Sequence, residues 1–125
     1  MSKIKVKDVM NKDFIVFSPN DIGGEVVNYL YRERKSYAPV VEDNKLVGWI
    51  TALDLLAGCK HSKLEDLMLL IDEIKILNEN DELTDELIDE MIKNEVVAYP
   101  VVNDNDEVVG TLSVFDIIKY LKNKE

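Results

Sequence analysis

The fold is decided by one short stretch that occurs twice, first as Gly48-Trp49-Ile50-Thr51-Ala52-Leu53-Asp54 and again as Gly110-Thr111-Leu112-Ser113-Val114-Phe115-Asp116. In both copies a glycine and a short apolar run precede a hydroxyl residue, two spacers and an aspartate. This pattern predicts a strand that turns directly into a helix, with Thr51 or Ser113 as the N-cap residue.

A helix start of this kind suits an anionic ligand. Its first N–H groups lack partners within the helix, and it carries the positive end of the helix dipole. The aspartate three residues after the cap lies on the same side of the first turn. Its two oxygens can accept hydrogen bonds from neighbouring hydroxyls such as a ribose cis-diol. One short segment can therefore hold both a phosphate and a sugar.

The same pattern has a simpler interpretation, because S/T-x-x-D/E is a common capping box at helix starts. For either copy taken singly, capping is the favoured interpretation. Its occurrence at equivalent positions of a repeat favours ligand contact, and the two roles can coexist.

Composition restricts the class of protein. The chain has 125 residues, within the range of a single domain. No apolar run approaches a membrane span, and the first residues lack the apolar core of a signal peptide. The one cysteine, Cys59, cannot form an internal disulfide, so we expect a cytoplasmic location. A net charge of −10 makes nucleic-acid binding unfavourable.

Nearly the whole chain reads as two copies of one unit. Asp8-Val9-Met10 matches Asp66-Leu67-Met68, and Pro39-Val40-Val41 matches Pro100-Val101-Val102. The expected repeats are residues 1–62 and 63–125. A single β-α-β-β-α unit of this size exposes one sheet face and is marginal alone. We therefore predict an α+β fold in which two such repeats pack sheet to sheet around a pseudo-two-fold axis.

The expected elements follow from apolar periodicity and turn residues. In the first copy, strands are predicted at residues 14–17, 37–41 and 46–50. A helix capped by Ser18-Pro19-Asn20-Asp21 and a closing helix from Asp54 to about Gly58 complete it. In the second copy, strands are predicted at residues 74–77, 97–102 and 108–112. Its helices start near Asp81 or Thr84 and at Val114, and residues 64–70 are predicted to form a short connecting helix.

These motifs, in this order and present twice, resemble a tandem pair of cystathionine-β-synthase (CBS) domains, often called a Bateman module. The resemblance rests on Asp8-Val9-Met10, Ser18-Pro19-Asn20-Asp21, the run from Tyr37 to Val41 and the stretch ending at Asp54, and it recurs from Asp66 to Asp116. It covers essentially the full length. It implies regulation rather than catalysis, because such modules commonly bind AMP, ADP, ATP or S-adenosylmethionine in the cleft between the repeats.

The resemblance also implies which residues contact the ligand. The aspartate would hold the ribose hydroxyls, the Ser or Thr would approach the phosphate, and adenine would pack between the first strand and the residues before Pro-Val-Val. Site one would use Phe14, Ile15, Tyr37, Ala38, Thr51 and Asp54. Site two would use Lys75, Ile76, Ala98, Tyr99, Ser113 and Asp116. Asp72 and Glu73, ahead of the second copy's first strand, are expected to weaken phosphate binding there.

A basic cluster of Arg32, Arg34 and Lys35 stands out in this acidic chain. Cations suit the C-terminal end of a helix, so the cluster can be a solvated helix end. Alternatively it neutralises a ligand phosphate, and we slightly favour this interpretation for Arg34.

The leading hypothesis from the sequence is a stand-alone sensor of an adenosyl ligand, with no catalytic activity, that signals through a conformational or dimer change. The family resemblance implies a homodimer, and the effector would be a separate, unidentified protein. The alternative is a ligand-free dimerisation or adaptor module. The sequence shows no Ser-His-Asp set, metal-ligand spacing or glycine-rich phosphate loop, and no partner in nucleic acid or membrane is expected.

Overall fold

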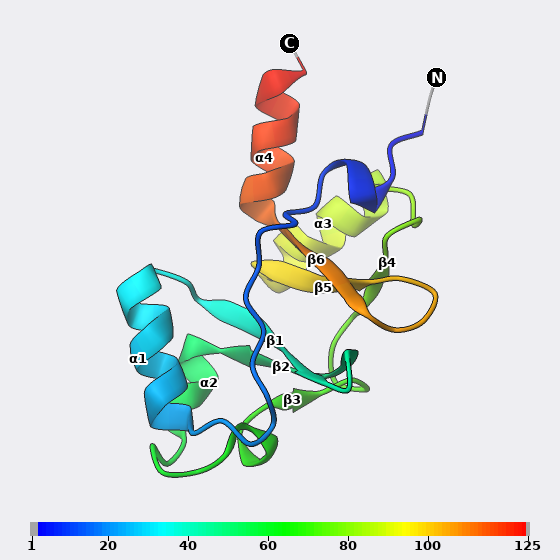
Figure 1. Ribbon diagram of the computed structural model, residues 1–125. Coiled ribbons are helices and arrows are strands. Elements are labelled where there is room, and N and C mark those ends of the chain that lie inside the picture. The colour runs from blue at the N-terminus through cyan, green and yellow to red at the C-terminus, as the bar shows by residue number, and fades with distance from the viewer. Residues whose placement is uncertain (1–2, 125) are drawn as a thin grey trace. The chain divides into compact units, whose positions relative to one another are not determined.

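The computed structural model describes residues 3–124, which form two compact units (Figure 1). One unit is Ile15–Lys75, named here the Thr51 unit after its N-cap residue. The other, the Ser113 unit, joins residues 3–14 to residues 76–124. The opening segment of the chain therefore folds with the second copy of the repeat.

The Thr51 unit contains one three-stranded sheet in the order β1-β2-β3. Strands β1 (Tyr37–Glu42) and β2 (Lys45–Thr51) form an antiparallel hairpin, and β3 (Leu69–Leu70) pairs antiparallel with β2. Asp43 and Asn44 turn the hairpin with φ values of 51° and 66°, a conformation that Asp and Asn tolerate better than most residues. Helices α1 (Gly23–Glu33) and α2 (Ala52–Ala57) lie side by side, and the short 3-10 helix η2 spans Leu64–Asp66 (Figure 1).

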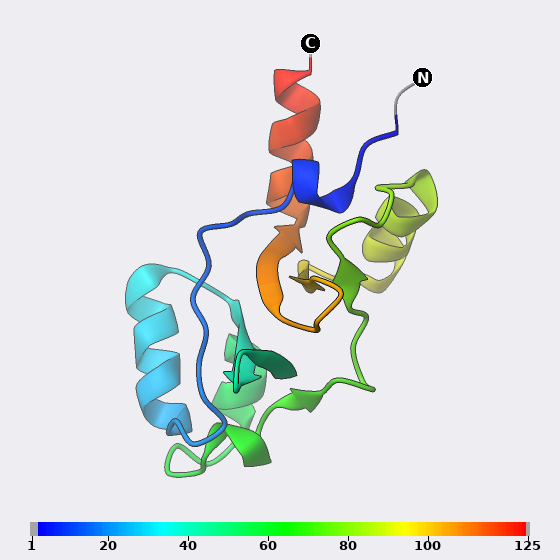
Figure 2. The same ribbon diagram turned by 45° about the vertical axis from the view of Figure 1, so that its right-hand side comes forward.

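The Ser113 unit has a matching sheet in the order β4-β5-β6. Strand β4 (Leu77–Asn78) runs parallel to β5 (Ala98–Val102), which pairs antiparallel with β6 (Val108–Ser113). Helix α4 (Val114–Asn123) continues directly from the end of β6 (Figure 2). Helix α3 (Asp85–Asn94) and the 3-10 helix η1 (Val6–Asp8) complete the unit. The α+β class and the two-sheet plan predicted from the sequence are confirmed.

Each unit has its own apolar core. Val26, Leu30, Val40, Ile50 and Leu64 centre the core of the Thr51 unit. Val6, Met91, Val101, Leu112 and Ile117 centre that of the Ser113 unit. Full burial of such side chains contributes roughly 1.5–3 kcal/mol each. Because Val6 is 0% exposed, it anchors the opening segment in the Ser113 unit.

Two motifs that recur in both copies, Asp-x-Met and the strand that contains the glycine, fit against each other. In the Ser113 unit the backbones of Asn11 and Thr111 exchange hydrogen bonds of 2.8 and 3.0 Å. A Cβ at Gly110 would lie 2.7 Å from Met10 Sδ and 2.9 Å from the Asn11 carbonyl. In the Thr51 unit, Met68 packs in the same way against Gly48. The glycines therefore allow the residues of the Asp-x-Met motif to approach the sheet closely.

The predicted first strand of each copy is much shorter than expected. Residues 14–17 form no strand, and only Phe17 makes a parallel bridge to Val40. In the second copy only Leu77 and Asn78 are paired. Extending either parallel pairing towards the N-terminus, before Phe17 or before Leu77, would need a hydrogen bond donated by the backbone N–H of Pro39 or Pro100. Proline has no such N–H, so the pairing stops there.

The predicted cap of α1 is also wrong. Ser18 and Asp21 close a separate turn, in which the Ser18 N–H donates to Asp21 Oδ2 at 2.8 Å, and the helix begins at Gly23. The N–H groups of Gly23 and Gly24 donate to the carbonyls of Ser62 and Lys60, both at 2.8 Å. A Cβ on Gly24 would lie 2.8 Å from the Lys60 carbonyl, so backbone replaces a side-chain cap here.

The remaining predicted elements agree more closely with the structure. Both hairpins and both closing helices are confirmed, and α2 ends at Gly58 as predicted. Thr84 caps α3 by accepting a bond from the Leu87 N–H. Residues 64–70 are only partly helical, because η2 is followed by strand β3.

Candidate functional site

The Thr51 helix start has the geometry predicted for an N-cap. Thr51 has φ −122° and ψ 153°, and its Oγ1 accepts a hydrogen bond from the Asp54 N–H at 3.1 Å. The Thr51 hydroxyl donates in turn to Asp54 Oδ2 at 2.7 Å. The Ala52 N–H donates to the Ser36 carbonyl at 2.9 Å, which ties the helix to the residue before β1. The hydroxyl and the acid therefore lie next to each other at the N-terminal end of α2, and this end of the helix is called the helix mouth below.

The Ser113 helix start uses the same residues in a different way. Ser113 Oγ accepts from the Asp116 N–H at 3.1 Å, and Asp116 Oδ2 accepts from the Ser113 backbone N–H at 2.8 Å. Together these two bonds form a full capping box. Ser113 is 4% exposed, whereas Asp116 is half-buried. Both hydroxyl residues are therefore N-caps, but only the Ser113 unit forms the full capping box, and Asp116 Oδ1 still has acceptor capacity.

A hollow of about 580 Å³ opens beside Asp116 within the Ser113 unit. This volume lies in the range of roughly 300–1,000 Å³ that is typical of small-molecule sites. The opening segment supplies one wall and one face of α4 the other, and the lining residues are Asp8, Val9, Met10, Asn11, Lys12, Asp13, Asp116, Lys119, Tyr120 and Asn123. Figure 2 shows this opening segment beside the start of α4.

Local hydrogen bonds fix the opening segment that forms this wall. Asp8 Oδ2 accepts from the Lys5 N–H at 3.0 Å, and Asn11 Oδ1 accepts from the Asp13 N–H at 2.8 Å. Charged groups of both signs line the hollow, namely the carboxylates of Asp8, Asp13 and Asp116 and the ammonium groups of Lys12 and Lys119. Such a lining can hold a polar ligand but attracts a polyphosphate weakly.

Sequence reasoning missed these lining residues, apart from Asp116. The Asp8-Val9-Met10 motif was recognised as a repeat, yet nothing local indicates that it folds with the second copy. The spacing of Asp116, Lys119, Tyr120 and Asn123 was a usable signal, because these positions share one face of a helix.

The residues predicted to contact adenine lie in several environments. The Tyr37 ring stacks on Trp49 with centroids 5.3 Å apart. Ala38, Ala98 and Tyr99 are buried, with Tyr99 only 6% exposed. Burial, with a smaller contribution from Glu90, raises the pKa of Tyr99. Within the Ser113 unit, Tyr99 therefore acts as a neutral core residue over the physiological pH range.

The other predicted adenine contacts lie where the chain passes from one unit to the other. Phe14 and Ile15 flank one of these boundaries, and Lys75 and Ile76 flank the other. Ile15 packs against the core of the Thr51 unit.

Arg34 lines a second hollow, of about 440 Å³, within the Thr51 unit. Its guanidinium carbon lies 4.8 Å from the centre of the Tyr31 ring. Lys35, Ala52 and Leu56 also line this hollow, whereas Thr51 and Asp54 do not. The structure thus groups Arg34 with the exposed faces of α1 and α2 rather than with the predicted ribose-binding acid.

Residues 3–124 contain neither a metal-binding cluster nor a membrane-spanning helix. Within that range, no cluster of three or more His, Cys, Asp or Glu side chains is arranged to hold a metal ion. No helix formed by these residues is both long and apolar enough to span a membrane.

Comparison with known proteins matches the repeat directly. The CBS domain family model matches residues 6–60 and again residues 64–123. The CBS domain-containing protein MJ0729 of Methanocaldococcus jannaschii is 79% identical over 99% of this chain and 100% of its own length.

Solved structures give the same result for the fold. The CBS domain pair of protein MJ0100, solved in complex with 5′-methylthioadenosine and S-adenosyl-L-methionine, is 28% identical with a TM-score of 0.80, over 99% of this chain and 100% of that one. CBSX2, solved in complex with AMP, is 20% identical with a TM-score of 0.84, over 97% and 98% of the two chains. With the family model matched twice along the sequence, this chain belongs to the CBS domain family and is a tandem CBS pair.

Proposed function

We propose that this CBS pair is a regulatory module that binds an adenosine-containing ligand and catalyses no reaction. One observation carries the proposal: both units present a hydroxyl and a carboxylate together at a helix mouth, Thr51 with Asp54 and Ser113 with Asp116. In the Ser113 unit the carboxylate also lines a hollow of about 580 Å³.

Each part of the mouth has a distinct role. The carboxylate accepts hydrogen bonds from the ribose hydroxyls, and charge-assisted bonds of this kind contribute about 1.5–3 kcal/mol each. The Thr or Ser hydroxyl and the first N–H groups of the helix face the 5′ substituent. In the Thr51 unit the Thr51 hydroxyl occupies one acceptor position of Asp54 Oδ2, and the carboxylate retains further acceptor capacity for the ribose hydroxyls.

The proposed ligand class is an adenosyl compound, with AMP, ADP, ATP and S-adenosylmethionine as the candidates. Support comes from the related pair that was solved with 5′-methylthioadenosine and S-adenosyl-L-methionine. Signalling follows if the ligand binds one conformation more tightly than another.

We also propose that the protein is a cytoplasmic homodimer acting on a separate effector protein. The support for pairing is the apolar surface of the helices, where Leu53 and Leu56 are 78% and 71% exposed and Phe115 is 69% exposed. Exposed apolar side chains on the face of a helix, such as Leu53 and Leu56 on α2, mark an interaction site. The alternative function, a ligand-free dimerisation adaptor, would use the same surface.

A ligand screen tests the function directly. AMP, ATP and S-adenosylmethionine are titrated calorimetrically, and thermal unfolding is followed at saturating ligand. Binding is expected to raise the unfolding temperature, because the ligand binds only the folded chain. Replacing Asp54 and Asp116 together by Asn should abolish the rise, whereas Glu65→Gln at an exposed position of η2 should leave it intact. If none of the three ligands gives a binding heat or raises the unfolding temperature, the adaptor function is established instead.

A further inference from the structure

The exposed surface of the Thr51 unit combines apolar and basic groups. Tyr31, Leu53 and Leu56 are 68%, 78% and 71% exposed. Tyr31 and Leu56 line the hollow of about 440 Å³, together with Arg34 and Lys35. These five residues are called the basic patch.

The Ser113 unit presents the equivalent surface with the opposite charge. Ile92, Phe115 and Ile118, at the repeat positions of Tyr31, Leu53 and Leu56, are 69%, 69% and 59% exposed. Glu95 takes the position of Arg34, Val96 that of Lys35, and Asp89 that of Asn28, which also lines the hollow. The residues Asp89, Ile92, Glu95, Phe115 and Ile118 are called the acidic patch.

The backbones beneath the two patches are alike. Arg34 follows α1 with φ 56° and ψ 40°, and Glu95 follows α3 with φ 53° and ψ 39°. The Ala52 N–H donates to the Ser36 carbonyl and the Val114 N–H to the Val97 carbonyl, both at 2.9 Å. The patches therefore differ in side chains rather than in shape of the chain.

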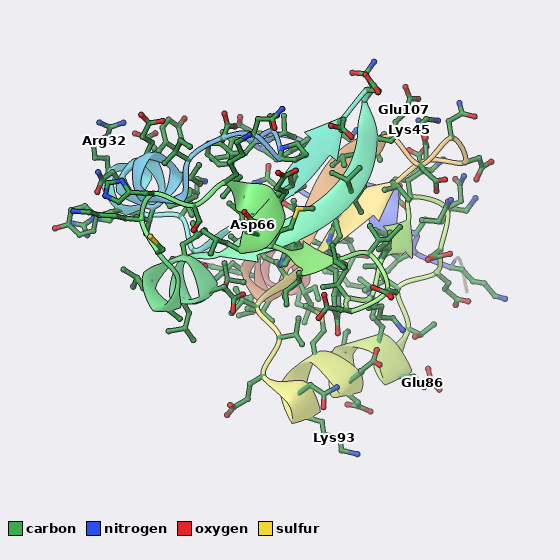
Figure 3. The ribbon with its side chains drawn as sticks, turned by 90° about the horizontal axis from the view of Figure 1, so that it is seen from below. Arg32, Lys45, Asp66, Glu86, Lys93 and Glu107 are labelled. Atoms are coloured by element: carbon green, nitrogen blue, oxygen red, sulfur yellow. The ribbon has the colours of Figure 1, made fainter. Side chains whose placement is uncertain are left out.

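Other charges near the patches do not reverse this contrast. Arg32 and Lys93 occupy equivalent positions and are both cations, and Figure 3 shows their side chains directed away from α1 and α3. Glu86, also labelled on α3 in Figure 3, has a carboxylate counterpart in Glu25 of α1, so this pair leaves the contrast unchanged. Lys35, in contrast, has only an uncharged counterpart, Val96.

We propose that two copies of this chain pair head to tail, with the basic patch of one copy bound to the acidic patch of the other. The inference rests on the proposed homodimer and specifies its orientation. The apolar side chains supply the buried area, and the charges select the partner surface. A head-to-head pair would place Arg34 against Arg34 and Glu95 against Glu95, and like charges at a desolvated contact are unfavourable.

Cysteine cross-linking tests the orientation. The backbone hydrogen bond at His61 and the Ser62 hydroxyl lower the pKa of the exposed Cys59 thiol, so all variants carry Cys59→Ser. Tyr31→Cys and Ile92→Cys are placed on separate chains of different tagged length, mixed and oxidised. The expected product is a disulfide-linked dimer that contains one chain of each kind. Its yield should be at least about tenfold higher than the yield of linked dimer from either variant oxidised alone. Glu65→Cys, exposed on η2 outside both patches, replaces Tyr31→Cys as the matched control and should give background only.

Exchange of the two charges provides a second, independent measurement. Arg34→Glu gives the Thr51 unit the residue that the Ser113 unit has at the equivalent position, and Glu95→Arg does the reverse. Both positions have the same left-handed backbone conformation, so each fold already tolerates the introduced residue type there. Each single variant should raise the dimer dissociation constant on the order of tenfold, and both together in one chain should restore it. A head-to-head pair would be insensitive to either change.

Two results would overturn the inference. Cross-linking of identical variants in preference to mixed ones would establish the opposite orientation, and a monomer at every concentration in sedimentation would remove the pair. The ligand-induced rise in unfolding temperature is measured on chains that keep Cys59 and carry no introduced cysteine. Ligand binding can therefore fail or succeed separately from the pairing.

Discussion

The Thr51 and Ser113 helix mouths share one sequence pattern but use its acid differently. Asp116 is held by the backbone N–H of its own cap residue, in a full capping box at the start of the ten-residue helix α4. Asp54 instead accepts the Thr51 hydroxyl, at the start of the six-residue helix α2. The acid of the Ser113 unit is therefore held by backbone and that of the Thr51 unit by a side-chain hydroxyl, and each carboxylate retains acceptor capacity for a ligand.

The surroundings of the two mouths reinforce this contrast. Asp116 shares its hollow with Asp8 and Asp13 as well as Lys12 and Lys119. Arg34 and Lys35 of the Thr51 unit line a different hollow, which includes neither Thr51 nor Asp54. Since carboxylates repel phosphates, the lining beside Asp116 favours a compact, weakly charged adenosyl ligand in the Ser113 unit.

The largest effect is expected at Gly110, on which the fit of the opening segment depends. A side chain there would meet the Asn11 carbonyl at 2.9 Å as well as Met10. Because backbone cannot swing aside, Gly110→Val should cost about 3 kcal/mol in the free energy of unfolding, measured by urea denaturation.

Gly58 provides the matched control for Gly110. All three atoms nearest to a Cβ at Gly58 belong to the Leu67 side chain, which can move. Gly58→Val, which introduces the same side chain, should therefore cost no more than about 1 kcal/mol. Equal losses for the two variants would show that close backbone approach is not what Gly110 provides.

The next effect concerns ligand binding at each mouth separately. Asp116→Asn and Asp54→Asn each weaken the charge-assisted bonds to ribose, and each should lower affinity at its own unit about 10- to 100-fold. Titration calorimetry of the wild type should show two sites, and each variant should lose a different one. If either variant loses both sites together, the two mouths hold a single ligand and the comparison between them fails.

A smaller effect separates capping from binding in the protein without ligand. Asp116→Ala removes a bond to a backbone N–H and should cost about 1 kcal/mol of unfolding free energy. Asp54→Ala removes only a bond from a side-chain hydroxyl, so about 0.5 kcal/mol is expected. The urea midpoints should therefore rank wild type, Asp54→Ala and Asp116→Ala in falling order, and a reversed rank would contradict the hydrogen-bond assignment.

Local patterns explain how far the sequence predicted the fold and the helix mouths. The strand–helix stretches at Thr51 and Ser113 and the Asp43-Asn44 turn are determined by neighbouring residues, so both hairpins and both closing helices were predicted. Elements that depend on distant residues were missed. Pro39 and Pro100 shorten strands far away in the sequence, the carbonyls of Lys60 and Ser62 cap α1, and Val6 anchors its segment among residues of the second copy.

The candidate site divides in the same way. Ser113 and Asp116 are three residues apart in the sequence, and their geometry followed from this spacing. The wall of the hollow beside Asp116 comes from residues 8–13, and no local signal links that segment to α4. Arg34 was grouped with the ligand because it is basic, although its neighbours are Tyr31 and Leu56.

The smallest expected effect distinguishes the two roles considered for Arg34. If Arg34 neutralises a ligand phosphate, Arg34→Ala weakens ATP binding more than adenosine binding, by a few-fold at an exposed position. If it lies at the contact between copies, the ratio of the two affinities is unchanged and the dimer dissociation constant rises instead. Because Arg34 lies over the Tyr31 ring and lines a hollow that excludes Asp54, the second outcome is expected. Lys45→Ala, an exposed cation on β2 outside both patches, controls for the loss of one positive charge, and calorimetry with sedimentation on the same samples decides between the roles.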